Sequence, residues 1–282
     1  MSLAKKEVDV IGRSARYLAA GSGPPLVLLH GTGTNRREWG WALPILARGR
    51  SVYAPDLPGF GGHGPANDAS PERSAAFVAG FADALGLGRA AVAGNSFGGL
   101  VALRLALSEP ARVSALCLAD SAGLGREVNP ALVAPAAPGA GGLTVLWGKS
   151  PVGAAQRALS RGPLLFANPL RAPRAWYEEQ YRAARSPGLM ETTLATLRAN
   201  LGPSGQRRVL LDELPRLQMP TLVLWGARDR VFPAAQARDA VGRLRRGELA
   251  LIPNCGHLPH VERPGEFAAV LRRFLDEHAP DA

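Results

Sequence analysis

The chain has 282 residues, of which 46% are hydrophobic and 20% charged. This composition excludes a disordered or collagen-like protein, because it supplies enough apolar surface for a core and neither Gly nor Pro follows a short period. The 33 Lys and Arg residues outnumber the 23 Asp and Glu residues, for a formal net charge of +10. Clustered positive charge favours nucleic acids and anionic membranes, but here the basic residues are scattered singly or in pairs. We therefore expect neither a nucleic acid nor a membrane as a partner.

Cysteine usage and hydropathy bear on compartment and cofactors. Cys117 and Cys255 are the only cysteines, too few for a disulfide framework or a zinc site. The N-terminus lacks the long apolar stretch of a signal peptide, and no segment offers about 18 consecutive apolar residues. We expect a cytoplasmic protein with no metal and no cofactor.

Short apolar runs without polar alternation recur along the chain, a pattern typical of strands buried on both faces of a parallel sheet. They follow an expected N-terminal hairpin at 8–18 and lie at 26–29, 51–54, 90–93, 115–118, 221–225 and 249–252. Between them, capping signals and length predict helices at 38–48, 70–86, 96–108, 233–245 and 264–278. This alternation predicts an α/β fold with a mostly parallel central sheet flanked by helices.

The alternation of strands and helices stops between residues 121 and 215. This segment contains an Ala, Pro and Gly-rich stretch and then expected helices with several aromatic residues. It is too long for an ordinary loop. We interpret residues 121–215 as a helical lid inserted into a core made of residues 1–120 and 216–282.

The most informative motif is Gly94-Asn95-Ser96-Phe97-Gly98, which lies between a predicted buried strand and a predicted helix. A Gly-x-Ser-x-Gly sequence at such a junction forms a tight turn that presents the serine hydroxyl above the sheet. The helix N-terminus beside it stabilises developing negative charge. Ser96 is therefore the candidate nucleophile.

With this motif, the sequence resembles the α/β-hydrolase superfamily over nearly its whole length apart from the insertion. In that family the nucleophile, an acid and a histidine follow one another along the chain. The resemblance implies that Asp229, after the strand at 221–225, is the acid and that His257, after the last strand, is the base. Asp120 is a competing acid, since some relatives carry their carboxylate after the preceding strand. We expect His260 to be a supporting or surface residue.

The resemblance also implies an oxyanion hole made by the backbone amides of Thr32 and Phe97. Thr32 lies in the segment His30-Gly31-Thr32-Gly33, which follows the strand at 26–29. We expect His30 to be structural, with its ring bonded inside this loop. The family turn at 56–61 is expected to be structural too, and the alternative that His63 borders the pocket is left open.

The triad implies attack by Ser96 on a carbonyl group, with a carboxylic ester of a small hydrophobic molecule as the leading substrate. An alternative is carbon–carbon bond hydrolysis of a dienone acid, because Asn95 and the Cys255-Gly256-His257 segment are similar to meta-cleavage-product hydrolases. Leu258 weakens this match, since that group usually has an aromatic residue there. A third alternative is a non-catalytic protein that only binds a small molecule.

The insertion is expected to set substrate specificity. Its aromatic residues, with Trp39, Trp41 and Phe232, are candidates for an apolar wall. Residues 121–215 hold 11 Lys and Arg against 6 Asp and Glu. This balance leaves open whether the substrate is anionic or whether the lid arginines only form a solvated surface.

Overall fold

The computed structural model describes residues 4–61, 64–66, 68–136 and 141–281. Eight strands form one sheet with the spatial order β1-β2-β4-β3-β5-β6-β9-β10. Their bounds are β1 Ala4–Asp9, β2 Ser14–Ala20, β3 Pro25–Leu29, β4 Ser51–Pro55, β5 Ala90–Asn95, β6 Val113–Ala119, β9 Thr221–Gly226 and β10 Gly247–Ile252. β1 pairs with β2 and β2 with β4 in antiparallel register, whereas the remaining neighbours are parallel. The predicted hairpin and mostly parallel sheet are therefore confirmed.

Helices cover both faces of the sheet, because alternate residues of each central strand point to opposite sides and both sets are apolar. One face packs on α2 (Pro71–Ala84), α3 (Phe97–Ser108) and α9 (Ala235–Val241) through residues such as Leu29 and Val92. The other face packs on α1 (Leu43–Leu46) and α11 (Pro264–His278) through residues such as Leu28 and Ala93. The central strands thus separate two apolar cores.

The predicted helix at 38–48 is the one that differs most from its expected form. It is split into a 3-10 helix at Arg36–Trp41 and the short α1, whose second residue is Pro44. Proline lacks the N–H that a continuous helix would use at this point, so the chain starts a new helix there. α2, α3 and α11 match their predicted ranges to within two residues.

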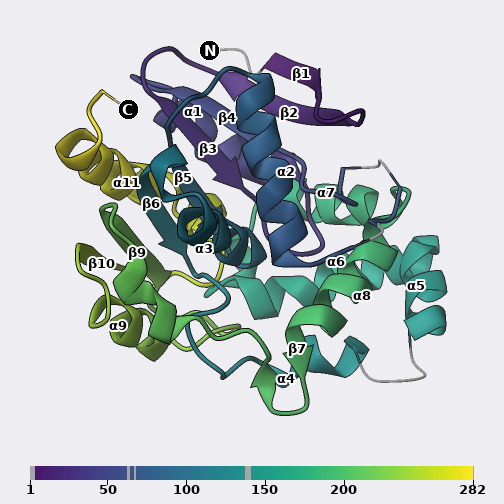
Figure 1. The fold of residues 1–282 in the computed structure, drawn as a ribbon. Coiled ribbons are helices and arrows are strands. Elements are labelled where there is room, and N and C mark those ends of the chain that lie inside the picture. The colour runs from purple at the N-terminus through teal and green to yellow at the C-terminus, as the bar shows by residue number, and fades with distance from the viewer. Residues whose placement is uncertain (1–3, 62–63, 67, 137–140, 282) are drawn as a thin grey trace.

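The segment between β6 and β9 is mainly helical. It contains α4 Pro130–Val133, α5 Gly141–Lys149, α6 Pro151–Leu165, α7 Arg174–Ala184, α8 Leu189–Asn200 and a small hairpin of β7 Leu201–Gly202 and β8 Gly205–Gln206. Figure 1 shows α5 to α8 grouped at one end of the molecule, away from both chain termini. Within the described ranges, no helix is both long enough and apolar enough to cross a bilayer.

Candidate active site

Ser96 lies at the sharp turn between β5 and α3. Its backbone has φ 57° and ψ −119°, a conformation that non-glycine residues rarely adopt. A Cβ atom at Gly94 would lie 2.1 Å from the carbonyl oxygen of Gly98, and a Cβ at Gly98 would lie 2.2 Å from that of Leu29. Glycine is required at both positions because the backbone approaches so closely. The two glycines of the motif therefore allow the strained turn that presents Ser96.

The loop after β3 packs directly against this turn. A Cβ atom at Gly31 would lie 3.2 Å from Cβ of Ser96, so the two segments are in contact. Thr32 and Phe97, the residues expected to donate oxyanion-hole amides, line the same cavity as Ser96. Phe97 is the first residue of α3, where backbone N–H groups have no partner within the helix. Phe97 thus has a backbone N–H beside the serine that the helix does not use, while the oxyanion hole formed by Thr32 and Phe97 stays a prediction.

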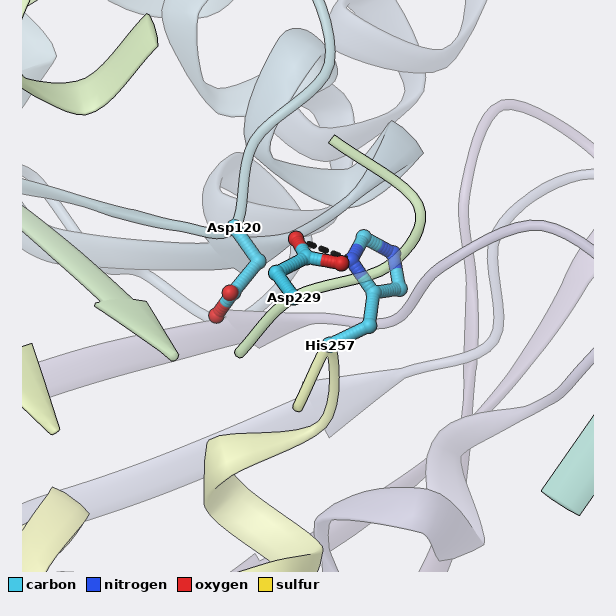
Figure 2. Close-up of side chains that lie close together, drawn as sticks. All are labelled: Asp120, Asp229 and His257. Atoms are coloured by element: carbon cyan, nitrogen blue, oxygen red, sulfur yellow. Dashed lines mark hydrogen bonds and ion pairs between the residues drawn. The ribbon is translucent and has the colours of Figure 1, made fainter. Parts of the chain in front are cut away.

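His257 and Asp229 come together from the loops after β10 and β9. Nδ1 of His257 lies 2.8 Å from Oδ2 of Asp229, and both side chains are buried. Figure 2 shows the Asp229 carboxylate turned toward the imidazole ring. The other carboxylate oxygen accepts hydrogen bonds from the backbone N–H groups of Val231 (2.7 Å) and Phe232 (3.3 Å). A carboxylate on Nδ1 holds the proton there and leaves Nε2 free to accept one.

The position of His257 is also fixed through its backbone. Its N–H donates to the carbonyl oxygen of Leu165 at the end of α6 (2.8 Å). Its own carbonyl oxygen accepts a hydrogen bond from Nδ2 of Asn95 (3.0 Å), which also donates to Ala119 (3.2 Å). Asn95 therefore ties the serine turn to the histidine loop across the sheet edge.

Asp120, the competing acid, lies beside Asp229 but has a different partner. Its Oδ1 accepts the backbone N–H of Gly226 (2.8 Å), and its backbone φ is 43°. Burial, and then the neighbouring carboxylate of Asp229, raise the pKa of Asp120 well above its usual range. Burial beside a second carboxylate thus disfavours the charged form of Asp120, and its Oδ1 binds the backbone of Gly226 rather than the imidazole. Among the described residues, Asp229 is the one whose carboxylate accepts the hydrogen bond that Nδ1 of His257 donates.

The same three residues have the chemistry of metal ligands. One ligand atom of each of Asp120, Asp229 and His257 lies within 4.8 Å of the others. Nδ1 of His257 is already engaged with Asp229, and Oδ1 of Asp120 with Gly226. A metal ion at this point would have to displace the bond that orients the imidazole. The hydrogen bonds alone account for the arrangement.

A cavity of about 510 Å³ lies over Ser96 and His257. Residues of α5, α6 and α8, all from the segment between β6 and β9, form much of its lining. Of the aromatic residues expected to wall the pocket, Trp147 and Phe232 are part of the described lining. Trp39, Phe166 and Trp176 are instead fully buried in the protein, where Phe166 packs edge-on against Trp176. The sequence alone cannot distinguish a cavity aromatic from a core aromatic, because both positions are apolar.

Four charged residues that the sequence motifs do not point to are part of the described cavity lining: Glu38, Arg157, Arg161 and Arg208. Glu38 is 2% exposed and accepts a hydrogen bond from Nε1 of Trp176 (3.2 Å), and burial raises its pKa. Arg157 and Arg161 lie one turn apart on α6, and both line the cavity. The sequence holds one signal for the two arginines: they are four residues apart in a segment expected to be helical, a spacing that puts them on the same helix face.

The remaining histidines are partly as expected. His30 is structural: Nδ1 donates to the carbonyl oxygen of Gly31 (2.9 Å) and Nε2 accepts the N–H of Leu57 (3.0 Å). His260 is completely buried, with its ring centroid 4.2 Å from that of Trp39, so it does not lie at the surface. His63 lies outside the described residues.

Comparison with known proteins identifies the family. The model of the alpha/beta hydrolase family matches residues 26–270. A 2-hydroxymuconate semialdehyde hydrolase from Pseudomonas sp. (strain CF600) is 31% identical over 96% of this chain and 94% of the relative. Among solved structures, a membrane phospholipase A is 30% identical with a TM-score of 0.78, covering 98% of this chain and 86% of the other. A serine hydrolase involved in carbazole degradation is 26% identical with a TM-score of 0.81, covering 98% and 100%. The family match, together with the eight-stranded sheet, shows that this chain belongs to the alpha/beta hydrolase family.

Proposed function

We propose that the protein is a serine hydrolase in which Ser96, His257 and Asp229 form the catalytic triad. The observation that carries this proposal is the 2.8 Å hydrogen bond between Nδ1 of His257 and Asp229, on a cavity that Ser96 also lines. The leading substrate is a carboxylic ester, or a related acyl compound, of a small hydrophobic molecule. No metal and no cofactor take part in this mechanism.

The proposed reaction begins when Nε2 of His257 takes the proton of the Ser96 hydroxyl and the oxygen attacks the substrate carbonyl carbon. The carbonyl oxygen becomes an oxyanion, which the amides of Thr32 and Phe97 stabilise. His257 then donates the proton to the leaving alcohol as the carbon–oxygen bond breaks, and an acyl-enzyme remains. Water, deprotonated by the same histidine, attacks the acyl-enzyme and releases the acid and Ser96.

The apolar cavity supports a hydrophobic substrate and a role for the insertion. Residues such as Leu164 of α6 and Leu194 of α8 line the space above the serine. We therefore propose that residues 121–215 form a lid that shapes the substrate pocket of a core made of residues 1–120 and 216–282. A small molecule is the proposed partner, in a protein that binds neither nucleic acid nor a membrane and works in the cytoplasm.

The proposal is tested by labelling with a fluorophosphonate probe at neutral pH. We expect the probe to modify Ser96, and we expect the Ser96→Ala variant to lose both labelling and hydrolysis of p-nitrophenyl esters. Ser160→Ala is the matched control, because Ser160 also lines the cavity but lies on α6 away from a strand-to-helix turn. Ester turnover that survives in Ser96→Ala would overturn the mechanism. Absence of labelling in the folded wild-type protein would favour the non-catalytic alternative.

A second candidate is hydrolysis of a carbon–carbon bond in a dienone acid. It is supported by the similarity to a 2-hydroxymuconate semialdehyde hydrolase and by Asn95, which binds the backbone of His257 (3.0 Å). A panel of p-nitrophenyl esters of graded chain length, run beside a dienone acid, separates the two activities. If the protein is an esterase, the kcat/KM of at least one ester exceeds that of the dienone acid. If the kcat/KM of the dienone acid exceeds that of every ester, the carbon–carbon bond hydrolase replaces the ester hydrolase as the proposed function.

A further inference from the structure

We propose that Arg157 and Arg161 form an anion-binding subsite in the active-site cavity, and that the substrate carries a carboxylate group bound there. The inference rests on the proposed function, because it concerns the ligand of the same cavity. It goes beyond that function by assigning two residues and a chemical class of substrate. The reasons lie in the hydrogen bonds, the charges and the position of the two guanidinium groups.

Both arginines have donors that are shut off from solvent and unused. Nη1 of Arg157 and Nε of Arg161 are buried and have no hydrogen-bond partner among the described groups. Unsatisfied buried donors are rare in folded proteins, and those of a charged group are costly to keep. Because the two residues also line the cavity, an acceptor supplied by a ligand would satisfy them.

The charge of this corner of the cavity is unbalanced. No carboxylate among the described residues lies within ion-pair distance of either Arg157 or Arg161. The nearby acid that acts on both guanidinium groups is Glu38, a single carboxylate for two cations. The third arginine of the lining, Arg208, already has a partner in Glu72 at 2.9 Å. One additional negative charge would therefore neutralise the pair.

The pair is held next to the reacting centre. Nη2 of Arg157 donates to the carbonyl oxygen of Gly33 (2.7 Å), which directly follows Thr32 of the expected oxyanion hole. Nη1 of Arg161 lies on the same side, 3.3 Å from the position that a Cβ atom on Gly33 would occupy. A carboxylate has two oxygens that fit the planar fork of a guanidinium group. We therefore expect the substrate carboxylate to lie a few bonds from the carbonyl that Ser96 attacks.

The test compares pairs of ligands that differ only in charge. Ethyl half-esters of succinic, glutaric, adipic and pimelic acid carry a carboxylate at neutral pH, and the corresponding ω-carboxamide ethyl esters are matched in size but uncharged. Calorimetry with the Ser96→Ala variant measures binding without turnover, and ethanol release by the wild type measures kcat/KM. At the best chain length, we expect the carboxylate to be preferred at least about tenfold, since charge-assisted hydrogen bonds are involved.

The ratio of carboxylate to carboxamide affinity, measured in arginine variants, shows whether these two residues form the subsite. In the Ser96→Ala background, Arg161→Gln is expected to remove most of the preference, and Arg161→Lys to retain part of it because the positive charge remains. Arg174→Gln is the control for net charge, since the Arg174 side chain is 93% exposed and lies outside the cavity lining. Circular dichroism checks that each variant is folded.

Failure of the anion subsite and failure of the proposed hydrolase give different experimental results. Equal binding of carboxylate and carboxamide at every chain length would overturn the subsite, as would a preference that survives in both Arg157→Gln and Arg161→Gln. Hydrolysis of neutral esters would in that case still support the serine hydrolase. Conversely, a preference that depends on Arg161, in a protein whose Ser96 neither reacts with the probe nor turns over esters, would support the subsite and overturn the proposed function.

Discussion

At the scale of single residues, the arrangement of the two aspartates has different consequences for each. Asp229 holds Nδ1 of His257, whereas Asp120 is bonded to the backbone of Gly226 and has a raised pKa. Two adjacent buried carboxylates cannot both ionise without strong repulsion. In the structure the imidazole contacts Asp229, whereas the surroundings of Asp120 disfavour its charged form.

The first prediction follows from this division. Asp229→Asn is expected to lower kcat by about a thousandfold or more, because an amide at this position stabilises the wrong tautomer of His257. Asp120→Asn is expected to change kcat by less than about tenfold, because its amide oxygen can still accept the Gly226 N–H and burial already disfavours a charge at this position. Steady-state kinetics on the best ester checks both variants. A larger loss in Asp120→Asn than in Asp229→Asn would assign the acid to Asp120.

A second residue prediction concerns pH and stability. Burial, and then the neighbouring His257, lower the pKa of His260 to about 3, and both of its ring nitrogens lack hydrogen-bond partners among the described groups. In the unfolded chain a histidine binds a proton below about pH 6.5. The folded state cannot bind this proton, so stability is lost as the pH falls from about 6.5 toward 3.

His260→Phe should remove this loss, because an apolar ring fits against Trp39 and Phe267 without binding a proton. Relative to the wild type, we expect the free energy of unfolding to rise by about 1 to 3 kcal/mol at neutral pH. Below about pH 6.5 the gain should increase by about 1.4 kcal/mol per pH unit. Urea unfolding between about pH 7 and pH 5 measures this difference. A difference in the free energy of unfolding between His260→Phe and the wild type that does not grow as the pH falls would contradict the protonation argument.

At the scale of elements, the turn between β5 and α3 combines strain with close packing. The backbone of Ser96 is left-handed, and Gly94 and Gly98 face carbonyl oxygens that leave no room for a methyl group. The surrounding sheet must therefore supply the free energy that keeps the turn in place. The strained backbone at this junction lowers the stability of the folded protein, and it is what places the Ser96 hydroxyl at the turn.

Gly94→Ala and Gly98→Ala are accordingly expected to destabilise the protein by at least about 3 kcal/mol each, because the added methyl group meets rigid backbone. Gly265→Ala in the first turn of α11 is the control, since a Cβ atom there has no neighbour within 4 Å. The control should change stability by less than about 1 kcal/mol. Thermal unfolding compares all three. A Gly94→Ala variant as stable as the wild type would contradict this, because it would show that the backbone of the turn can shift to accommodate a methyl group.

Most elements were predictable from the sequence because each has its own local signal. The strands β5 and β9 are continuous apolar runs, and α2 begins at a Ser-Pro capping signal. The hairpin of β7 and β8 was not predicted, since two-residue strands are too short to show a period. The break before α1 was also missed, although Pro44 provided a signal for it.

At the scale of the whole molecule, the two cysteines are probes of whether the sheet and the loop that carries His257 open to solvent. Cys117 lies on β6 in the middle of the sheet, and Cys255 lies two residues before His257, with exposures of 1% and 0%. Burial raises the pKa of both thiols, so the reactive thiolate is not formed at neutral pH.

We therefore expect neither thiol to react with Ellman's reagent in the native protein, and both to react as the molecule unfolds in denaturant. The rates should follow the unfolding transition measured by circular dichroism. Cys117→Ala and Cys255→Ala assign the signal to one thiol each. Rapid labelling of Cys255 before unfolding would reveal that the loop carrying His257 opens by itself.

The sequence by itself determined the α/β order of elements, because strands, turns and motifs are local patterns. Its resemblance to the α/β-hydrolase family also supplied the candidate residues Ser96, Asp229 and His257. Only the tertiary structure decided which carboxylate meets the imidazole and which aromatic residues line the cavity rather than the core. The tertiary structure also placed Arg157 and Arg161 in the lining of the cavity that contains Ser96, each with a buried donor that has no partner among the described groups. Contacts between residues far apart in the chain depend on how loops converge at the sheet edge, and burial then sets the charge of each group.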